Sequence, residues 1–315
     1  MHIPVLLQET LEAIAPRHGG RYIDGTVGGG GHAEAILDAS SPDSRLLGID
    51  RDPEAVARCR ARLAKFGDRF VCVHADFASM KSVAEQNGFE KVDGILLDLG
   101  VSSFQIDEAP RGFSFMNDGP LDMRMDTSRG LTASELLDSF RGDWKPLASL
   151  LREFGEEPAA AKIAKAVMEE HTKNPIRTTG RLASVIEKAV GGRKGSPRHP
   201  ATRSFQALRL AVNGETEQVL NGLEAALSIL ADDGTLAVIT FHSIEDRIAK
   251  QVLTAHEGRL VSLQQGGAKW EGREPAVKRI PRRPIFPSEK EISQNPRSRS
   301  AKLRVVRRVQ KPIEK

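Results

Sequence analysis

Asp24-Gly-Thr-Val-Gly-Gly-Gly-Gly-His32 is the stretch that decides the fold, because its four consecutive glycines follow a short apolar run and lead into a helical pattern. Glycine permits positive φ and leaves room for a ligand against the backbone, and a helix N-terminus attracts negative charge. The spacing Gly28-x-Gly30-x-x-Ala33 also fits the dinucleotide-binding fingerprint. The stretch predicts a cradle for an anionic group of a nucleotide-like ligand, with an ordinary glycine loop as the alternative.

Strand and helix patterns alternate around this loop through the first hundred residues. The helical pattern at 53–66 begins with Asp52 as N-cap and Pro53 at its first position. Such βαβ repetition indicates a parallel sheet with right-handed crossovers, so the predicted fold class is α/β. We expect strands at 21–24, 45–50, 70–74 and 91–99, and helices at 33–37, 53–66 and 79–86.

The alternation stops at residue 101 and returns only near residue 200. An irregular segment rich in Gly, Asp, Arg and Met is followed by helical patterns, one of which opens with the capping box Thr132-Ala-Ser-Glu135. We expect a sheet domain formed by 1–100 and 200–315, and an inserted, mainly helical domain at 101–199 that recognises the substrate. Further elements are predicted as helices at 202–230 and 243–253, a strand at 234–242 and an edge strand at 301–309.

Acidic residues end or follow four successive predicted strands, at Asp24, Asp50, Asp76 and Asp98. In open α/β sheets the carboxyl ends of the strands form the rim where ligands bind, although any single Asp there also suits a helix cap. Asp50 lies 22 residues after Gly28, where it can accept both ribose hydroxyls of an adenosine. Asp24 disfavours a pyrophosphate and suits a cationic amino group and sulfonium, so the predicted cofactor is S-adenosylmethionine.

Composition excludes several other classes of protein. The 315 residues are 39% hydrophobic and 28% charged, which is typical of a soluble globular chain. Only two cysteines are present, which excludes a disulfide scaffold and a cysteine-built zinc site and favours a reducing cytoplasm. With no apolar stretch long enough to cross a bilayer and no secretory signal, we expect a cytoplasmic protein without a membrane partner.

Positive charge is concentrated at the C-terminal end. Residues 269–315 hold 15 Lys/Arg and 5 Asp/Glu, a local net charge of +10 on a chain whose total is +4. This distribution predicts a polyanionic partner, with nucleic acid first, and a solvated tail as the alternative. The loop at 193–199 and Arg203 are further candidates for phosphate contacts.

Seven motifs in order give the chain a specific resemblance. It resembles the RsmH (MraW) family of bacterial methyltransferases, which act on N4 of a cytidine in small-subunit (16S) ribosomal RNA. The motifs are Asp24-Gly-Thr-Val-Gly-x-Gly-Gly-His32, Gly48-Ile-Asp-Arg-Asp52, Ile95-Leu-Leu-Asp-Leu-Gly-Val-Ser-Ser103, Arg111-Gly-Phe-Ser-Phe-Met116, Gly119-Pro-Leu-Asp-Met-Arg-Met-Asp126, His199-Pro-Ala-Thr-Arg203 and Phe241-His-Ser-Ile-Glu-Asp-Arg247.

The resemblance implies a class I S-adenosylmethionine-dependent methyltransferase fold, a Rossmann-like sheet with an inserted helical domain. It implies 16S ribosomal RNA as substrate, within the small ribosomal subunit or a precursor, and it allows a homodimer. The cofactor contacts that it implies are Gly30, Gly31, His32, Asp50, Phe77, Asp98 and Gln105.

Methylation of a cytosine amine needs an acceptor for the N4 hydrogens, because the N4 lone pair is delocalised into the ring. Asp98 is the candidate catalytic residue, although it lacks the Pro-Pro-aromatic sequence that follows the corresponding residue in many amine methyltransferases. Ser102, Ser103 and His242 are the other candidates. An NAD-dependent oxidoreductase and a non-catalytic RNA-binding protein remain as alternative functions.

Three aspartates in the irregular segment could suggest a metal site, but their spacing fits no EF-hand loop. Arginines alternate with them, so we expect ion pairs and no metal. The acidic residues are Asp118, Asp122 and Asp126, and the basic ones are Arg111, Arg124 and Arg129.

Overall fold

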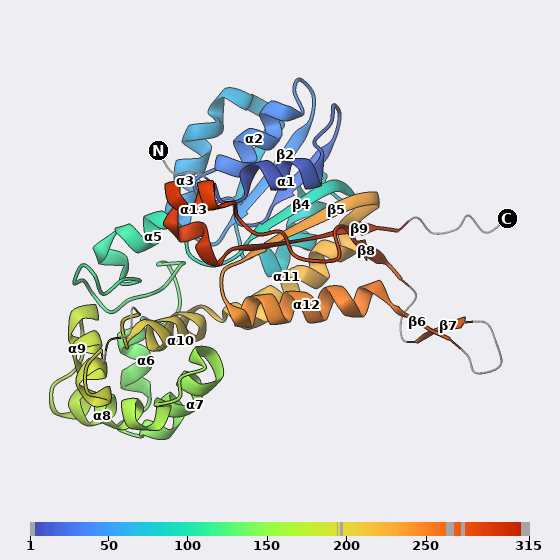
Figure 1. Ribbon diagram of the computed structural model, residues 1–315. Helices are drawn as coiled ribbons and strands as arrows, with labels where there is room; N and C mark the ends of the chain where they lie inside the picture. Colours follow the sequence, from blue (N-terminus) through green and yellow to red (C-terminus); the bar gives the residue numbers. More distant parts are fainter. Residues whose placement is uncertain (1–3, 194, 196–197, 263–267, 272–274, 310–315) are drawn as a thin grey trace. The chain divides into compact units, whose positions relative to one another are not determined.

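The computed structural model describes residues 4–193, 195, 198–262, 268–271 and 275–309, and the chain divides into two compact units (Figure 1). The first unit combines Met1–Gly100 with Thr216–Lys315, and the second comprises Val101–Glu215. The second unit is therefore an insertion into the first. It continues to Glu215, beyond the boundary at residue 199 that the sequence suggests, because the helix after that boundary packs into the second core.

A seven-stranded sheet organises the first unit, in the order β3-β2-β1-β4-β5-β9-β8. Strands β1 to β5 run parallel, whereas β9 is antiparallel to both β5 and β8. The predicted α/β fold with an inserted helical domain is confirmed. The strands are β1 (Arg21–Asp24), β2 (Arg45–Asp50), β3 (Phe70–His74), β4 (Val92–Asp98), β5 (Leu230–Thr240), β8 (Val277–Arg279) and β9 (Lys302–Arg308), with a separate hairpin of β6 (Arg259–Ser262) and β7 (Ala268–Glu271).

Helices cover both faces of this sheet, and successive strand residues supply the two cores alternately. On β4, Ile95 and Leu97 pack with α4, α11 and α12, whereas Leu96 faces the core formed with α1, α2 and α3. Burial on both faces explains why β4 is a continuous apolar run. The helices are α1 (Leu7–Ile14), α2 (Gly31–Ala39), α3 (Pro53–Leu63), α4 (Met80–Gln86), α11 (Glu215–Ile229), α12 (Ser243–Glu257) and α13 (Glu289–Gln294).

The second unit is helical and has its own core of leucines, isoleucines, alanines and Met168. The predicted capping box is confirmed, since the Thr132 and Glu135 side chains each accept a backbone N–H from the other residue. Its helices are α5 (Ser103–Asp107), α6 (Ala133–Ser139), α7 (Trp144–Gly155), α8 (Ala160–Lys173), α9 (Thr179–Val190) and α10 (Thr202–Asn213).

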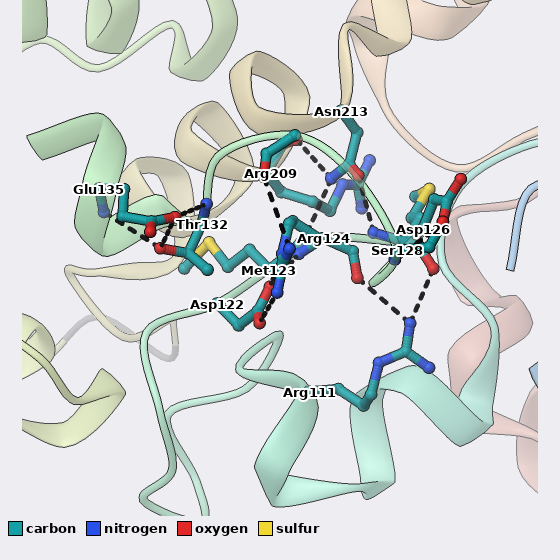
Figure 2. Close-up of polar contacts among 12 residues, drawn as sticks. Arg111, Asp122, Met123, Arg124, Asp126, Ser128, Thr132, Glu135, Arg209 and Asn213 are labelled. Carbon is teal, nitrogen blue, oxygen red and sulfur yellow. Dashed lines mark hydrogen bonds and ion pairs between the residues drawn. The ribbon is translucent and has the colours of Figure 1, made fainter. Parts of the chain in front are cut away.

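Polar contacts fix the irregular segment of the second unit, as Figure 2 shows. The ion pair of Asp122 with Arg124 joins Nε to Oδ1 at 2.8 Å, and Asp126 accepts from Arg129 Nε at 2.7 Å. The expected ion pairing is therefore confirmed for these two aspartates. The guanidinium of Arg111 also donates to the backbone carbonyls of Arg124 and Met125. Asp118 accepts from the backbone N–H of Gly180 at 2.7 Å.

Asn213, at the end of α10, closes this network from the other side (Figure 2). Its Oδ1 accepts from Met125 N at 2.8 Å, and its Nδ2 donates to the carbonyls of Met123 and Arg209 at 2.8 and 2.9 Å. The buried amide thus satisfies three backbone groups of the second unit.

We expect Asn213→Ala to lower the free energy of unfolding of the second unit by about 2–4 kcal/mol, because it leaves buried backbone groups without partners. Urea denaturation followed by near-ultraviolet circular dichroism measures this loss. Thr132→Ala, which removes an exposed cap, serves as the control and is expected to cost only about 1 kcal/mol. Equal midpoints for the two variants would contradict the assigned role of Asn213.

The C-terminal strand corrects one expectation from the sequence. The alternation at 301–309 suggested an edge strand, but β9 lies between β5 and β8. Its polar position Arg304 is buried and pairs with Asp246, Nε to Oδ1 at 2.8 Å. Arg304 contacts Asp246 where an edge strand would expose it to solvent. The alternation of polar and apolar residues at 301–309 was therefore misleading. Among the described residues, no helix has the length and apolarity required to cross a membrane.

Candidate functional site

Three carboxylates lie at the carboxyl ends of neighbouring strands of the first unit. Asp24 ends β1, Asp50 ends β2 and Asp98 ends β4, with β1 between the other two strands. The register aligns Asp24 with Gly48 and Leu96, so the three strands end at one rim. The structure therefore brings together three of the four acidic positions that the sequence assigned to a binding rim.

The glycine loop crosses this rim and begins α2. Gly28 and Gly30 have φ of 50° and 77°, which favours glycine at both positions. A Cβ on Gly30 would lie 2.9 Å from Cys59 Sγ, and one on Gly31 would lie 2.5 Å from Pro4 Cγ. Gly30 and Gly31 are thus required for packing of the loop. Their predicted contact with a cofactor stays a prediction.

Asp50 ties the loop to the end of β2. Its Oδ2 accepts from Gly28 N at 2.8 Å and its Oδ1 accepts from Asp52 N at 2.9 Å. Each carboxylate oxygen retains a further lone pair for an external donor such as a ribose hydroxyl. The loop contact of Asp50 could not be read from the sequence, because it joins residues 22 positions apart.

His32 and Asp98 face each other beneath the loop. His32 is buried, and its Nε2 lies 3.0 Å from the carbonyl of Val5; because a carbonyl only accepts, Nε2 carries the proton. Its Nδ1 lies 3.8 Å from Asp98 Oδ2. Among the described residues, the buried Oδ1 of Asp98 has no hydrogen-bond partner, so it is available to a bound ligand.

Phe77 follows β3 in a short 3₁₀ turn, Phe77–Ser79, after Asp76. The ring packs against α11, where a Cβ on Gly222 would lie 2.2 Å from Phe77 Cδ2. Glycine at 222 therefore makes room for the ring. Asp76 Oδ1 lies 3.1 Å from Arg51 Nε, an ion pair that the sequence did not reveal.

Gln105 belongs to the second unit and has a structural role there. It forms a capping box at the start of α5, in which Gln105 Oε1 accepts from Ser102 N at 3.0 Å and Ser102 Oγ accepts from Gln105 N at 3.2 Å. Ser102 is therefore a cap. A cofactor contact of Gln105 stays a prediction from the family resemblance.

Two residues near Asp98 were not assigned from the sequence. Thr26 Oγ1 accepts from Asp98 N at 2.6 Å, and Thr26 N donates to Asp24 Oδ1 at 3.1 Å, so Thr26 joins the ends of β1 and β4. Glu245, 2% exposed on α12, accepts from Phe241 N at 3.0 Å, and its carboxylate lies 3.0 Å from His242 Nε2. His242 is the N-cap of α12, and the His-x-x-Glu spacing was the signal for this arrangement.

The electrostatics of the rim follow from burial. Burial raises the pKa of Asp24 to about 7, and the charge of Asp50 adds to the rise. Burial likewise raises the pKa of Asp50 to about 6, against the lowering effect of the N–H groups of Asp52 and Gly28. The pKa of Asp98 lies well above its usual range because of burial and the charges of Asp24 and Glu245. Mutually repelling carboxylates in a buried rim favour a cationic ligand.

Part of the predicted nucleic-acid surface lies outside the described residues, namely 194, 196 and 197 of the basic loop and 272–274 and 310–315 of the C-terminal segment. Within the second unit, Arg203 donates to the carbonyl of Glu156 at 3.1 Å.

Comparisons with known proteins show the family of this chain. The sequence matches the MraW methylase family over residues 1–309. Curated relatives named ribosomal RNA small subunit methyltransferase H include one from Symbiobacterium thermophilum, 47% identical over 98% of this chain and 97% of the relative, and one from Citrifermentans bemidjiense, 46% identical over 98% of both chains. The solved N-methyltransferase NodS from Bradyrhizobium japonicum is 10% identical, with a TM-score of 0.40 over 97% of this chain and 93% of that chain. With a match over nearly all of its length, the chain belongs to the MraW methylase family.

Proposed function

We propose that this protein transfers a methyl group from S-adenosylmethionine to the N4 amine of a cytidine in 16S ribosomal RNA. Relatives of matching length carry the name of a small-subunit ribosomal RNA methyltransferase. The observation that carries the proposal is the rim of Asp24, Asp50 and Asp98, since a cationic cofactor fits where the buried Asp24 meets the half-buried Asp50 and Asp98, all three with raised pKa values.

The proposed cofactor contacts are those that the family resemblance implies: Gly30, Gly31, His32, Asp50, Phe77, Asp98 and Gln105. The two carboxylate oxygens of Asp50 each accept one backbone N–H, from Gly28 and Asp52, and their remaining lone pairs accept from the ribose hydroxyls. Phe77, fixed against Gly222, offers a ring for the adenine. Gly30, Gly31 and His32 shape the loop, and S-adenosylmethionine supplies an electrophilic methyl group on a sulfonium.

Asp98 is the proposed acceptor of the N4 proton. Bound S-adenosylmethionine would supply a methyl group and a positive charge, and that charge would favour the ionised form of Asp98, whose free Oδ1 would accept an N4–H bond. Burial and the charges of Asp24 and Glu245 raise the pKa of Asp98, which would suit it to take the proton that the methylated amine releases.

The second unit, residues 101–215, is the proposed recognition domain for RNA. A base must leave any stack before its amine reaches a buried methyl donor, which favours an exposed loop of RNA over a duplex. The assembled small subunit or its precursor and a homodimer are further expectations from the resemblance, and a cytoplasmic location is the expectation from the cysteine content.

The direct test incubates the purified protein with methyl-labelled S-adenosylmethionine and unmodified 16S ribosomal RNA, followed by nucleoside mass spectrometry. We expect label in N4-methylcytidine. Label in 5-methylcytidine or in a ribose-methylated nucleoside would overturn the assignment of the amine. A parallel calorimetric titration with NAD, for which we expect no binding, separates this function from that of an oxidoreductase.

Cofactor affinity is expected to depend on pH. Asp24 and Asp50, with pKa values of about 7 and about 6, are protonated and neutral below those values, and they bind a cation best when ionised. The affinity for S-adenosylmethionine should therefore rise between about pH 5 and 8, with release of protons on binding. Isothermal titration in two buffers of different ionisation enthalpy measures that release. A pH-independent affinity without proton release would contradict this electrostatic account.

A further inference from the structure

The edge of the sheet in the first unit carries exposed cations without acidic partners. Lys278 of β8 and Arg307 of β9 lie directly opposite each other in the antiparallel register, and both are exposed. Like charges in this arrangement destabilise a strand pair. In the described part of the chain, neither side chain has an ion pair. A polyanion at this edge would relieve their repulsion.

Two more exposed cations, Arg282 and Arg283, follow β8 directly. Within the described residues neither forms an ion pair, although the charge of Arg282 contributes to lowering the pKa of Glu257. Other cations nearby do have acidic partners: Arg279 pairs with Glu257, and Lys302 and Arg304 share Asp246. We call Lys278, Arg282, Arg283 and Arg307 the basic edge.

The backbone holds this segment firmly along β9. Ile280 N donates to Val305 O at 3.0 Å, and Ile285 and Leu303 exchange two hydrogen bonds of 2.9 Å. Prolines at 281, 284 and 287 restrict the φ angles between and after these anchors. From Arg307 to Leu303 the edge extends roughly 14 Å, at about 3.4 Å per residue. The cations are therefore presented on a rigid support next to β9, as Figure 1 shows for β8 and β9.

An exposed aromatic residue follows these cations closely in the sequence. Phe286 is 57% exposed, although its neighbour Ile285 packs into the core and Pro287 is buried. Exposed aromatic rings and arginines on one segment are the combination that binds single-stranded nucleic acid, with bases stacked on the ring and phosphates on the cations. A duplex keeps its bases stacked and would leave Phe286 without a partner.

We propose that the basic edge and Phe286 form a second RNA-binding surface, separate from the carboxylate rim, which holds a single-stranded segment of the same RNA. This inference rests on the proposed function for the identity of the RNA. It concerns residues at the β8–β9 edge, whereas the predicted cofactor contacts lie at the ends of β1 to β4 and in the second unit.

The test measures binding of a fluorescein-labelled oligouridine by anisotropy over a series of KCl concentrations. Arg282→Ala/Arg283→Ala should flatten the log–log salt dependence by up to ~1.4, because each phosphate contact on a single strand contributes about 0.7. Phe286→Ala should weaken binding about 5- to 150-fold without altering the slope, and Phe286→Trp should restore it. The control is Lys81→Ala/Lys250→Ala, which removes the same charge from exposed positions on α4 and α12.

An unchanged slope for the arginine variant, or equal flattening for the lysine control, overturns the proposal. Normal RNA binding by all variants would also overturn the proposal and would favour an acidic protein as the partner of the basic edge. Methyl transfer to 16S ribosomal RNA is measured on the same samples. If the wild-type protein does not methylate the RNA but the variants change the salt dependence as expected, the proposed function is rejected and the RNA-binding surface is still supported.

Discussion

Asp50→Ala is expected to weaken S-adenosylmethionine binding about 10²- to 10⁴-fold while the first unit stays folded. Two charge-assisted hydrogen bonds to the ribose would be lost, each worth roughly 1.5–3 kcal/mol. The same substitution removes the acceptor of Gly28 N–H, so the glycine loop also loses its attachment to β2. Isothermal titration of the variant gives the affinity, and circular dichroism confirms the fold.

Two companion variants separate these effects. Asp50→Asn keeps an oxygen for Gly28 and removes the charge, so an intermediate loss is expected. Asp52→Ala removes the acceptor of Glu54 N at the start of α3. It should cost stability of about 1 kcal/mol with little effect on cofactor affinity. An Asp50→Ala protein that is folded and binds the cofactor normally would remove Asp50 from the site.

Removal of the second unit is expected to abolish methyl transfer to RNA while cofactor binding survives. Joining Gly100 to Thr216 through a short Gly/Ser linker deletes residues 101–215, and the two cores of the first unit contain no residue from that range. The sheet unit should therefore fold alone. Calorimetry with S-adenosylmethionine and a methyl-transfer assay on 16S ribosomal RNA measure the two properties separately.

The variant Gln105→Ala in the full chain is the matched control for this deletion. If Gln105 contributes a hydrogen bond to the cofactor, its loss lowers affinity by about fivefold, equivalent to about 1 kcal/mol, and the deletion should lower affinity by a similar factor. Full methyl transfer by the shortened protein would show that the second unit does not recognise the substrate. A far larger loss of cofactor affinity in the deletion would show that further residues of the second unit contribute.

The local patterns predicted the parallel half of the sheet closely. The predicted bounds agree with the structure for three strands, Arg21–Asp24, Arg45–Asp50 and Phe70–His74, and for the N-cap Asp52. Burial on both faces produces apolar runs, and helix capping requires particular residue types, so both can be recognised in the sequence. Features set by contacts between distant segments were missed. Neither β8 nor the short α1 was predicted, and β9 was taken for an edge strand, because its alternation does not reveal Asp246 as the partner of Arg304.

The candidate site shows the same division. Spacing along the chain placed Asp24, Asp50 and Asp98 at one rim, since parallel strands align their ends. The bond from Gly28 to Asp50, the join made by Thr26 and the contact of Glu245 with His242 depend on tertiary structure. The domain boundary was wrong for a related reason, because the amphipathic pattern of α10 does not indicate which core it joins.

The position of the insertion between β4 and β5 has a consequence for biosynthesis. These two strands pair directly, Asp98 with Ile239, yet about 130 residues separate the end of β4 from the start of β5. The entropic cost of closing so long a loop, relative to an ordinary crossover, is only about 2 kcal/mol. During synthesis on the ribosome, however, the edge of β4 that will pair with β5 stays unpaired until the whole helical unit has been made. Translation speed through residues 101–215 therefore sets how long that apolar strand is exposed to misassociation before β5 covers it.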